Sequence, residues 1–185
     1  MRAFRAPCIP ESPEDITDMI YRVPVSVVPV VSNVGHIKYR HGWTTEYCHR
    51  RNVFIFIVSG EFTFVFRERR TTVRAGCYQV IPAGTPYRVS AGDDCDYYYA
   101  HFSASVPLKS VSKEEAKSAL ESLKSGRELP ELAENDESTC IFLPETGSFG
   151  ENTESMKYRF SRVEMSMKQY GVSPDIRYSY NEIWR

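Results

Sequence analysis

Short apolar runs separated by glycine- and proline-containing breaks dominate the chain from residue 21 to about residue 105. The runs are rich in β-branched and aromatic residues and recur roughly every ten residues, which is typical of an antiparallel sandwich or barrel rather than of βαβ units. The pattern predicts strands at 53–58, 62–66, 71–74, 78–81, 87–90 and 96–103. We therefore expect a mainly β domain built as an antiparallel β-barrel.

Two turns within this region have their own signatures. The segment Ser59-Gly60-Glu61 joins the strands at 53–58 and 62–66, and such a short glycine-containing connection predicts a β-hairpin. The run Arg-Glu-Arg-Arg at 67–70 predicts a solvated hairpin tip rather than a nucleic-acid patch, because the charge around it is balanced.

Helical periodicity replaces the strand pattern after Pro107. Ser112 followed by Glu115 is a capping-box pattern, and Gly126 ends the helix that it predicts. The predicted apolar face consists of Ala116, Ala119, Leu120 and Leu123. The polar stretch 127–139 predicts a loop, and the stretch 140–150 predicts one more short strand and turn.

A second amphipathic helix is predicted from about Asn152 to Tyr170. Its apolar residues recur at intervals of three and four: Met156, Phe160, Val163 and Met167. This spacing leaves Lys157, Arg159, Arg162, Glu164 and Lys168 for solvent. The stretch 173–185 restarts a helical pattern and stops without a capping signal, so we expect Arg185 to mark a domain boundary rather than a natural terminus.

Composition excludes several classes of function. A net charge of −1 lacks the basic footprint that duplex-binding surfaces need. The five cysteines are scattered, with no Cys-x-x-Cys pair, which favours a reduced, cytoplasmic setting. No export signal or membrane span is expected, because prolines interrupt the most apolar early stretch, 23–31. No nucleophile elbow of the Gly-x-Ser-x-Gly type is present.

The segment GCYQVIPAGTPY at 76–87 resembles the second sequence motif of the cupins. Gly76, Pro82 and Gly84 match that motif, while Tyr87 stands where the metal-binding histidine of the family belongs. Alignment of the first cupin motif on Gly60 places three further residues at ligand positions: Tyr47, His49 and Val53. One of the four ligands is therefore kept, and a catalytic metal needs about three. The resemblance implies a cupin barrel with no metal and no other cofactor.

Three segments in order resemble the N-terminal, arabinose-binding-like regulatory domain of AraC-type transcription regulators. They are IFIVSGEFTFVF at 55–66, AGCYQVIPAGTPYRV at 75–89 and DYYYAHF at 96–102. The resemblance covers roughly 50–102 and implies an effector-binding barrel followed by helices that pair two copies. It implies dimerisation through Met156, Phe160, Val163 and Met167. The DNA-binding helix-turn-helix units of the family are absent, and we expect them after residue 185.

Side chains alternate in a strand, so Tyr97, Tyr99 and His101 share one face while Tyr98 and Phe102 share the other. The resemblance implies that the residues on the His101 side line the effector pocket. Tyrosine suits a sugar or aromatic ligand, because the ring stacks and the hydroxyl donates a directional hydrogen bond. The alternative is that these rings fill the barrel interior themselves.

Three residues complete the expected ligand site. Tyr87 follows the Pro-Gly turn, and Arg40 and Trp43 precede the core strands, where an arginine could bind a carboxylate bidentately and a tryptophan could stack. Arg40 could equally be a surface residue. The four histidines, His36, His41, His49 and His101, have no fixed short spacing and predict no metal site.

The expected organisation is an N-terminal arm at 1–20, the cupin-like barrel at 21–106, a helix with an acidic connection at 107–150 and a helical dimerisation segment at 151–185. We expect a non-enzymatic, homodimeric sensor domain that binds a small polar metabolite, for example a carbohydrate. Two alternatives stay open: a metal-dependent cupin enzyme with a ligand set rearranged around His49 and His101, and a dimerisation module without a ligand.

Overall fold

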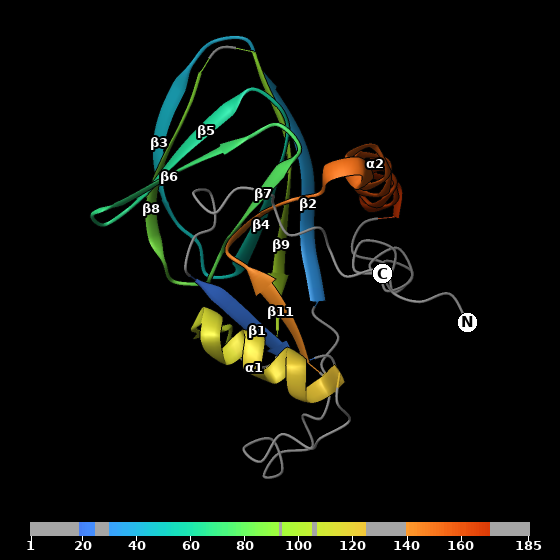
Figure 1. Cartoon of the computed structure of the whole chain (residues 1–185). Coiled ribbons are helices and arrows are strands. Elements are labelled where there is room, and N and C mark those ends of the chain that lie inside the picture. Colours follow the sequence, from blue (N-terminus) through green and yellow to red (C-terminus); the bar gives the residue numbers. More distant parts are fainter. Residues whose placement is uncertain (1–18, 25–29, 93, 105–106, 125–139, 171–185) are drawn as a thin grey trace. The chain divides into compact units, whose positions relative to one another are not determined.

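The computed structural model describes residues 19–24, 30–92, 94–104, 107–124 and 140–170 (Figure 1). These residues belong to two compact units. The larger unit contains residues 30–103 and 146–170, and the smaller unit contains residues 19–24, 104–124 and 140–145.

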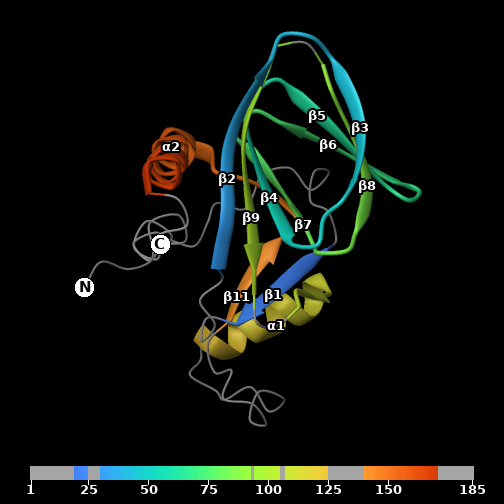
Figure 2. The same ribbon diagram turned by 180° about the vertical axis from the view of Figure 1, so that it is seen from behind.

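The larger unit is a jelly roll of two antiparallel sheets facing one another (Figures 1 and 2). One sheet has the strand order β12-β7-β4-β9-β2 and the other has the order β3-β8-β5-β6. The first sheet contains β12 (Thr146–Ser148), β7 (Cys77–Ile81), β4 (Asn52–Ser59), β9 (Cys95–Ser103) and β2 (Val30–Tyr39). The second sheet contains β3 (Trp43–Cys48), β8 (Pro86–Ala91), β5 (Glu61–Phe66) and β6 (Arg69–Arg74). The predicted antiparallel, mainly β fold is confirmed.

The predicted hairpin between β4 and β5 is wrong. β4 pairs with β7 and β9, whereas β5 pairs with β6 and β8 in the other sheet. Gly60 allows the chain to change sheets, since it has a φ of +84° and a Cβ there would lie 3.1 Å from Cys95. The hairpin tip predicted at 67–70 does exist, because β5 and β6 are paired neighbours in one sheet.

The core of the larger unit lies between the two sheets. Inward-facing side chains of β4 and β9 meet those of β5, β6 and β8, as the period-two pattern of apolar residues requires. The buried cluster comprises Val53, Ile55, Ile57, Phe62, Phe64, Phe66, Val73, Ile81, Tyr87, Val89, Ala91, Cys95 and Tyr97. The ligand residues predicted on β8 and β9 are therefore part of the same interior.

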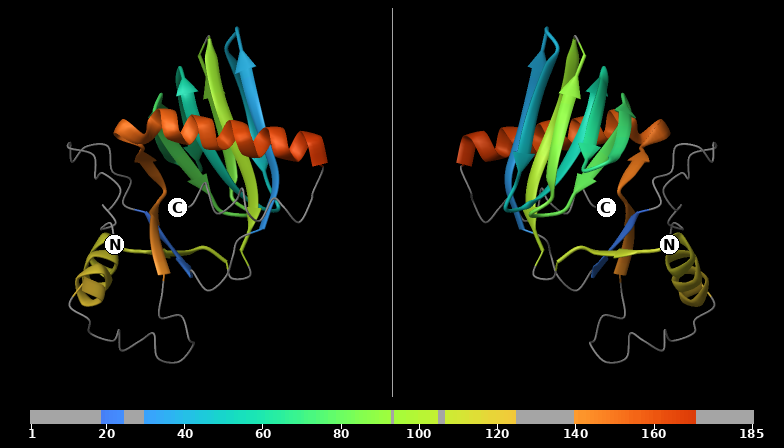
Figure 3. Two further views of the ribbon diagram at one scale, coloured as in Figure 1. Left: turned by 90° about the vertical axis from the view of Figure 1, so that its right-hand side faces the viewer. Right: turned by 90° about the vertical axis from the view of Figure 1, so that its left-hand side faces the viewer.

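The second helix, α2 (Thr153–Tyr170), is confirmed and follows a short 3-10 turn, η2 (Gly150–Asn152). Figure 3 shows it running across the strands of the five-stranded sheet. Phe160 is fully buried and stacks with Phe54, Phe56 and Tyr98 on the outer face of that sheet. Met156 and Val163 are also buried, and Met167 is half-buried. The residues predicted to pair two copies thus pack on their own chain, and their role in a dimer stays a prediction.

One solvent position predicted on α2 is wrong. The pattern assigned Glu164 to solvent, but the residue is 7% exposed and turns toward β2. The apolar stripe of the helix is wide enough that its flank, one position beyond Val163, is covered by the sheet edge. A carboxylate therefore lies in the contact between helix and sheet.

The smaller unit is a three-stranded antiparallel sheet with the order β10-β1-β11, accompanied by α1 (Lys113–Lys124). Its strands are β1 (Ile20–Pro24), β10 (Lys109–Val111) and β11 (Cys140–Pro144). The predicted capping box of α1 is confirmed: the Ser112 amide donates to Glu115 Oε2 (2.9 Å), and the Glu115 amide donates to Ser112 Oγ (3.1 Å). Tyr21 Oη donates to the buried carboxylate of Glu145 (3.2 Å).

Strand membership departs from the predicted segments at two places. β1, placed by the sequence in the barrel segment 21–106, pairs with β10 and β11, and β12 pairs with β7 of the jelly roll. The predicted loop at 127–139, most of the arm at 1–20 and the C-terminal pattern at 173–185 lie outside the described residues. Among the helices that the structure describes, none is both long and apolar enough to cross a membrane.

Candidate functional site

β9 places its tyrosines on two faces, as the alternation predicted. Tyr97 packs edge-on against Phe62 inside the jelly roll at a ring separation of 5.0 Å, and Tyr99 lies between Tyr97 and His101 on the same face. Tyr98 points to the opposite face, where it stacks on Phe160 of α2. The residues that the sequence grouped as Tyr97, Tyr99 and His101 therefore share the interior.

A cluster of polar rings, His49, Tyr87 and His101, lies at one end of this interior. His49 Nε2 and Tyr87 Oη are 3.1 Å apart, within hydrogen-bonding distance. The rings of His49 and His101 are 4.7 Å apart, and Tyr47 stacks on His49 at 5.0 Å. Tyr87 is on β8 of one sheet, His101 is on β9 of the other, and His49 lies in the connection between β3 and β4, so the fold brings together groups that are distant in sequence. We call these three residues, with Tyr47 and Tyr99 beside them, the inner polar cluster.

Burial alters the titration of the cluster. Burial lowers the pKa of His49, and burial followed by the positive charges of His49 and Arg51 lowers the pKa of His101. Burial also raises the pKa of Tyr87, with a smaller contribution from Tyr47. At neutral pH the two imidazoles are consequently neutral and the Tyr87 phenol is protonated, which gives the cluster both hydrogen-bond donors and acceptors.

The indole N–H of Trp43 is a further polar group near the interior of the jelly roll. Trp43 opens β3 and packs beside Phe62 and Tyr39, at ring separations of 6.3 and 5.3 Å. Its Nε1 atom is buried and has no hydrogen-bond partner among the described residues. An unpaired buried N–H is costly, about 1–3 kcal/mol, and unusual in a native structure. The predicted stacking residue therefore also offers a free donor.

The predicted residues differ in how accessible they are. Tyr87 and Tyr97 are buried within the apolar cluster, whereas Tyr99 and His101 are partly exposed. Arg40 lies in the exposed turn between β2 and β3. His49, which contacts Tyr87, is also partly exposed.

The expected ligand site did not include His49 or Tyr47, although His49 was named with His101 for the alternative metal site. Both occupy ligand positions of the first cupin motif, so the motif alignment was the signal that could have found them. The other two histidines lie elsewhere: His36 pairs with Asp96 and stacks on Tyr98 on the outer face, and His41 lies in the exposed turn after β2.

The inner polar cluster does not match the ligand set of a metal cupin. Two imidazoles are adjacent, but the described residues contain no group of three histidine, cysteine, aspartate or glutamate side chains placed to hold a metal ion. Tyr47, Val53 and Tyr87 occupy the remaining ligand positions. Phenol and alkyl side chains in those places suit hydrogen bonding and packing rather than coordination.

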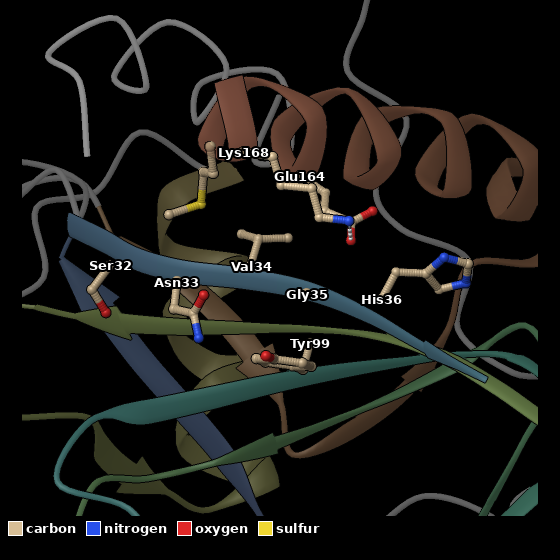
Figure 4. A pocket seen from close by; sticks show the side chains of 9 residues that line it. Ser32, Asn33, Val34, Gly35, His36, Tyr99, Glu164 and Lys168 are labelled. Atoms are coloured by element: carbon tan, nitrogen blue, oxygen red, sulfur yellow. Dashed lines mark ion pairs between the residues drawn. The ribbon is translucent and has the colours of Figure 1, made fainter. Parts of the chain in front are cut away.

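A separate pocket lies between β2 and α2 on the larger unit (Figure 4). It is shallow and open, with a volume of about 450 Å³. Glu164, Met167 and Lys168 of α2 face Val34 and Gly35 of β2 across it. The ring of Tyr99 lies on the other side of β2, beneath Gly35, so this tyrosine borders both the pocket and the interior (Figure 4).

Solved structures and a family profile were compared with the chain. Solved structures similar to the chain include a cupin-2 domain-containing protein from Shewanella frigidimarina, with 20% identity over 39% of this chain and 76% of that chain and a TM-score of 0.34. A second is a putative mannose-6-phosphate isomerase from Ralstonia eutropha, with 14% identity over 49% of this chain and 86% of that chain and a TM-score of 0.35. A third is a deletion mutant of oxalate decarboxylase from Bacillus subtilis, with 13% identity over 70% of this chain and 37% of that chain and a TM-score of 0.36.

No curated protein matches the chain. Residues 35–98 match the sequence profile of the cupin domain family. This segment runs from the middle of β2 into β9 and so includes most of the jelly roll. The match and the two-sheet strand order together support a cupin domain in this segment.

Proposed function

We propose that the cupin domain binds a small polar metabolite, such as a sugar or a sugar acid, and that the chain is the effector-sensing and dimerisation part of an AraC-type transcription regulator. It acts without chemical turnover and without a metal. DNA binding belongs, in this proposal, to a different domain of the regulator.

The inner polar cluster is the observation that carries the proposal. Neutral His49 and His101 beside the hydroxyls of Tyr87 and Tyr99 supply the alternating donors and acceptors that a polyhydroxylated ligand requires. Trp43 adds a buried donor without a partner. A few convergent polar groups on a mostly apolar interior are typical of ligand sites.

The regulator context rests on the resemblance of three chain segments to AraC-type sensor domains. The structure adds a route from site to helix that a sensor needs. β9 carries Tyr99 on its inner face and Tyr98 on its outer face, and Tyr98 packs on Phe160 of α2. A shift of β9 on ligand binding would therefore reach α2 directly. A coupling of about 1–3 kcal/mol between two states would be sufficient for regulation.

The test is a thermal-shift screen against sugars, sugar acids and other small metabolites, with metal analysis of the same preparation. A ligand at one hundred times its dissociation constant adds about 2.7 kcal/mol of stability. Tyr99→Phe and Tyr87→Phe remove single hydroxyls and should weaken the hit, whereas Tyr98→Phe, on the outer face of the same strand, is the matched control.

Each outcome decides between the candidates. A hit that depends on Tyr99 and Tyr87 but not on Tyr98, in metal-free protein, supports the sensor. Stoichiometric metal that is lost in His49→Gln and His101→Gln would replace it with the metal-dependent cupin enzyme, which the adjacency of these two imidazoles favours. If the protein binds neither a ligand nor a metal, the remaining candidate is the dimerisation module without a ligand.

A further inference from the structure

The pocket between β2 and α2 contains a carboxylate that the cupin interior does not use. The Glu164 side chain is 9% exposed and lies on the wall of the pocket (Figure 4). A buried carboxylate is unfavourable unless a cation or hydrogen-bond donors meet it. Burial first and then the negative charge of Glu164 raise the pKa of Tyr98 on the neighbouring sheet. Glu164 therefore places a negative charge on the wall of an open pocket.

The cation that meets Glu164 is held loosely. Lys168 Nζ lies 2.8 Å from Glu164 Oε1, one helical turn away, and its side chain is 73% exposed. An exposed lysine in such a pair gains little from it and keeps most of its freedom in water. The buried partner of the pair is therefore fixed, and the exposed partner can be exchanged for another ammonium group.

The remaining walls combine polar and apolar groups. Val34 of β2 and Met167 of α2 are the apolar side chains that line the pocket, and Ser32, Asn33 and His36 of β2 add polar groups. The Tyr99 ring lies beneath Gly35. Other charges of the neighbourhood are already paired on the strand surface, where Asp96 accepts from Lys38 (3.0 Å) and contacts His36. A volume of about 450 Å³ lies within the range of small-molecule sites.

We propose that this pocket binds a small organic ammonium ion with a short apolar chain. The ammonium group takes the place of Lys168 at Glu164, and Val34 and Met167 contact the apolar chain. The site shares only Tyr99 with the inner polar cluster, and its test does not depend on the sensor function.

The test is an NMR titration of the whole chain with butylammonium, with 1-butanol and butyrate as probes of the same length. The backbone amide of Gly35 reports on the pocket, because glycine amides are resolved and Gly35 lines its wall. We expect a saturable shift with butylammonium and binding at least about tenfold weaker with the uncharged or anionic probe. Equal response to all three probes, or no saturable response, would overturn the proposal.

Two variants on α2 sharpen the test. Glu164→Gln should weaken butylammonium binding by at least about tenfold, because the charge-assisted hydrogen bond is lost. Glu154→Gln is the control: Glu154 is exposed on the same helix and pairs with Lys157 at 3.9 Å. An equal loss in both variants would contradict a site at Glu164, and the dispersion of each spectrum shows whether the variant is folded.

The variant Lys168→Ala is the most informative, because the proposal predicts that it tightens rather than weakens the binding of butylammonium. Removing the competing ammonium should tighten butylammonium binding by about twofold, the amount that such a helical pair is worth. If the pocket instead held an anion through Lys168, the same variant would weaken binding and butyrate would be the better probe. That pattern would overturn the proposal.

Discussion

Glycines on both edges of the five-stranded sheet make room for a tyrosine of the next strand. Gly35 of β2 lies opposite Tyr99, and Gly147 of β12 lies opposite Tyr78. A Cβ at Gly35 would meet the Tyr99 ring at 2.5 Å, and one at Gly147 would meet the Tyr78 hydroxyl at 2.6 Å. The ring covers the backbone of the edge strand, a device that pins strand register. These positions therefore tolerate no side chain without movement of the ring.

Gly35→Ala should destabilise the protein by about 1–3 kcal/mol, because the added methyl group overpacks against Tyr99. Urea unfolding measures the change. Gly92→Ala is the control, since a Cβ at Gly92 meets nothing within 4 Å. In a Tyr99→Leu background the Gly35→Ala change should cost less than about 0.5 kcal/mol. Full additivity of the two changes would contradict the packing argument.

The adjacent imidazoles make stability depend on pH. Folding lowers the pKa values of His49 and His101, whereas in the unfolded chain these histidines titrate near their ordinary pKa of 6.5. The unfolded state therefore binds more protons as pH falls, so stability is complete above about pH 6.5 and declines through the folded pKa values. Unfolding free energies measured from about pH 7.5 to about pH 5 should fall, and less steeply in the double variant His49→Gln, His101→Gln. Parallel curves would contradict this assignment.

At the scale of elements, α2 is attached to the sheet mainly through one ring. Phe160 is fully buried between Phe54, Phe56 and Tyr98. Phe160→Ala should cost about 3–5 kcal/mol in unfolding free energy, the range for a large buried ring. Tyr158→Ala on the exposed side of the helix should change it by less than about 0.5 kcal/mol. Similar losses in both variants would show that α2 packs through a different face.

The positions of the strands were predictable, because alternation and turn residues are local signals. The pairing of distant strands was not predictable from these signals. The connection at Ser59–Glu61 has the residues of a hairpin, yet β4 and β5 do not pair. β4 pairs with β7 and β9 in one sheet, whereas β5 pairs with its neighbour β6 and with the distant β8 in the other. Glu164 was assigned to solvent because a helical pattern does not show that a sheet edge covers its flank. Burial of this kind depends on tertiary packing.

The candidate site was predictable to the same extent. One strand sufficed to group Tyr97, Tyr99 and His101, since alternation alone places them on one face. His49 joins them only because the connection between β3 and β4 brings its ring beside His101 of β9, and no spacing in the sequence encodes that contact. The cupin motif alignment was the single signal that marked it.

At the scale of the whole molecule, the position of α2 restricts how two copies can pair. Met156, Phe160 and Val163 are buried on the chain's own sheet, so their predicted contact with a second copy would require α2 to leave this position. The opposite side of the helix carries two exposed apolar residues seven positions apart, Tyr158 and Met165, which are 63% and 59% exposed. We expect the proposed homodimer to form through this stripe.

Sedimentation equilibrium tests that expectation. The double variant Tyr158→Glu, Met165→Glu should convert a dimer to a monomer, because two carboxylates would be buried against their copies in the partner. Thr72→Glu, on the exposed face of β6, should leave the dimer intact. Unfolding free energy should change by less than about 0.5 kcal/mol in the monomeric fold, since both residues lie on the surface. A double variant that stays dimeric would show that the contact between copies lies elsewhere. In that case α2 would not form the dimer, and the path from Tyr99 through Tyr98 and Phe160 would not lead to the dimer contact.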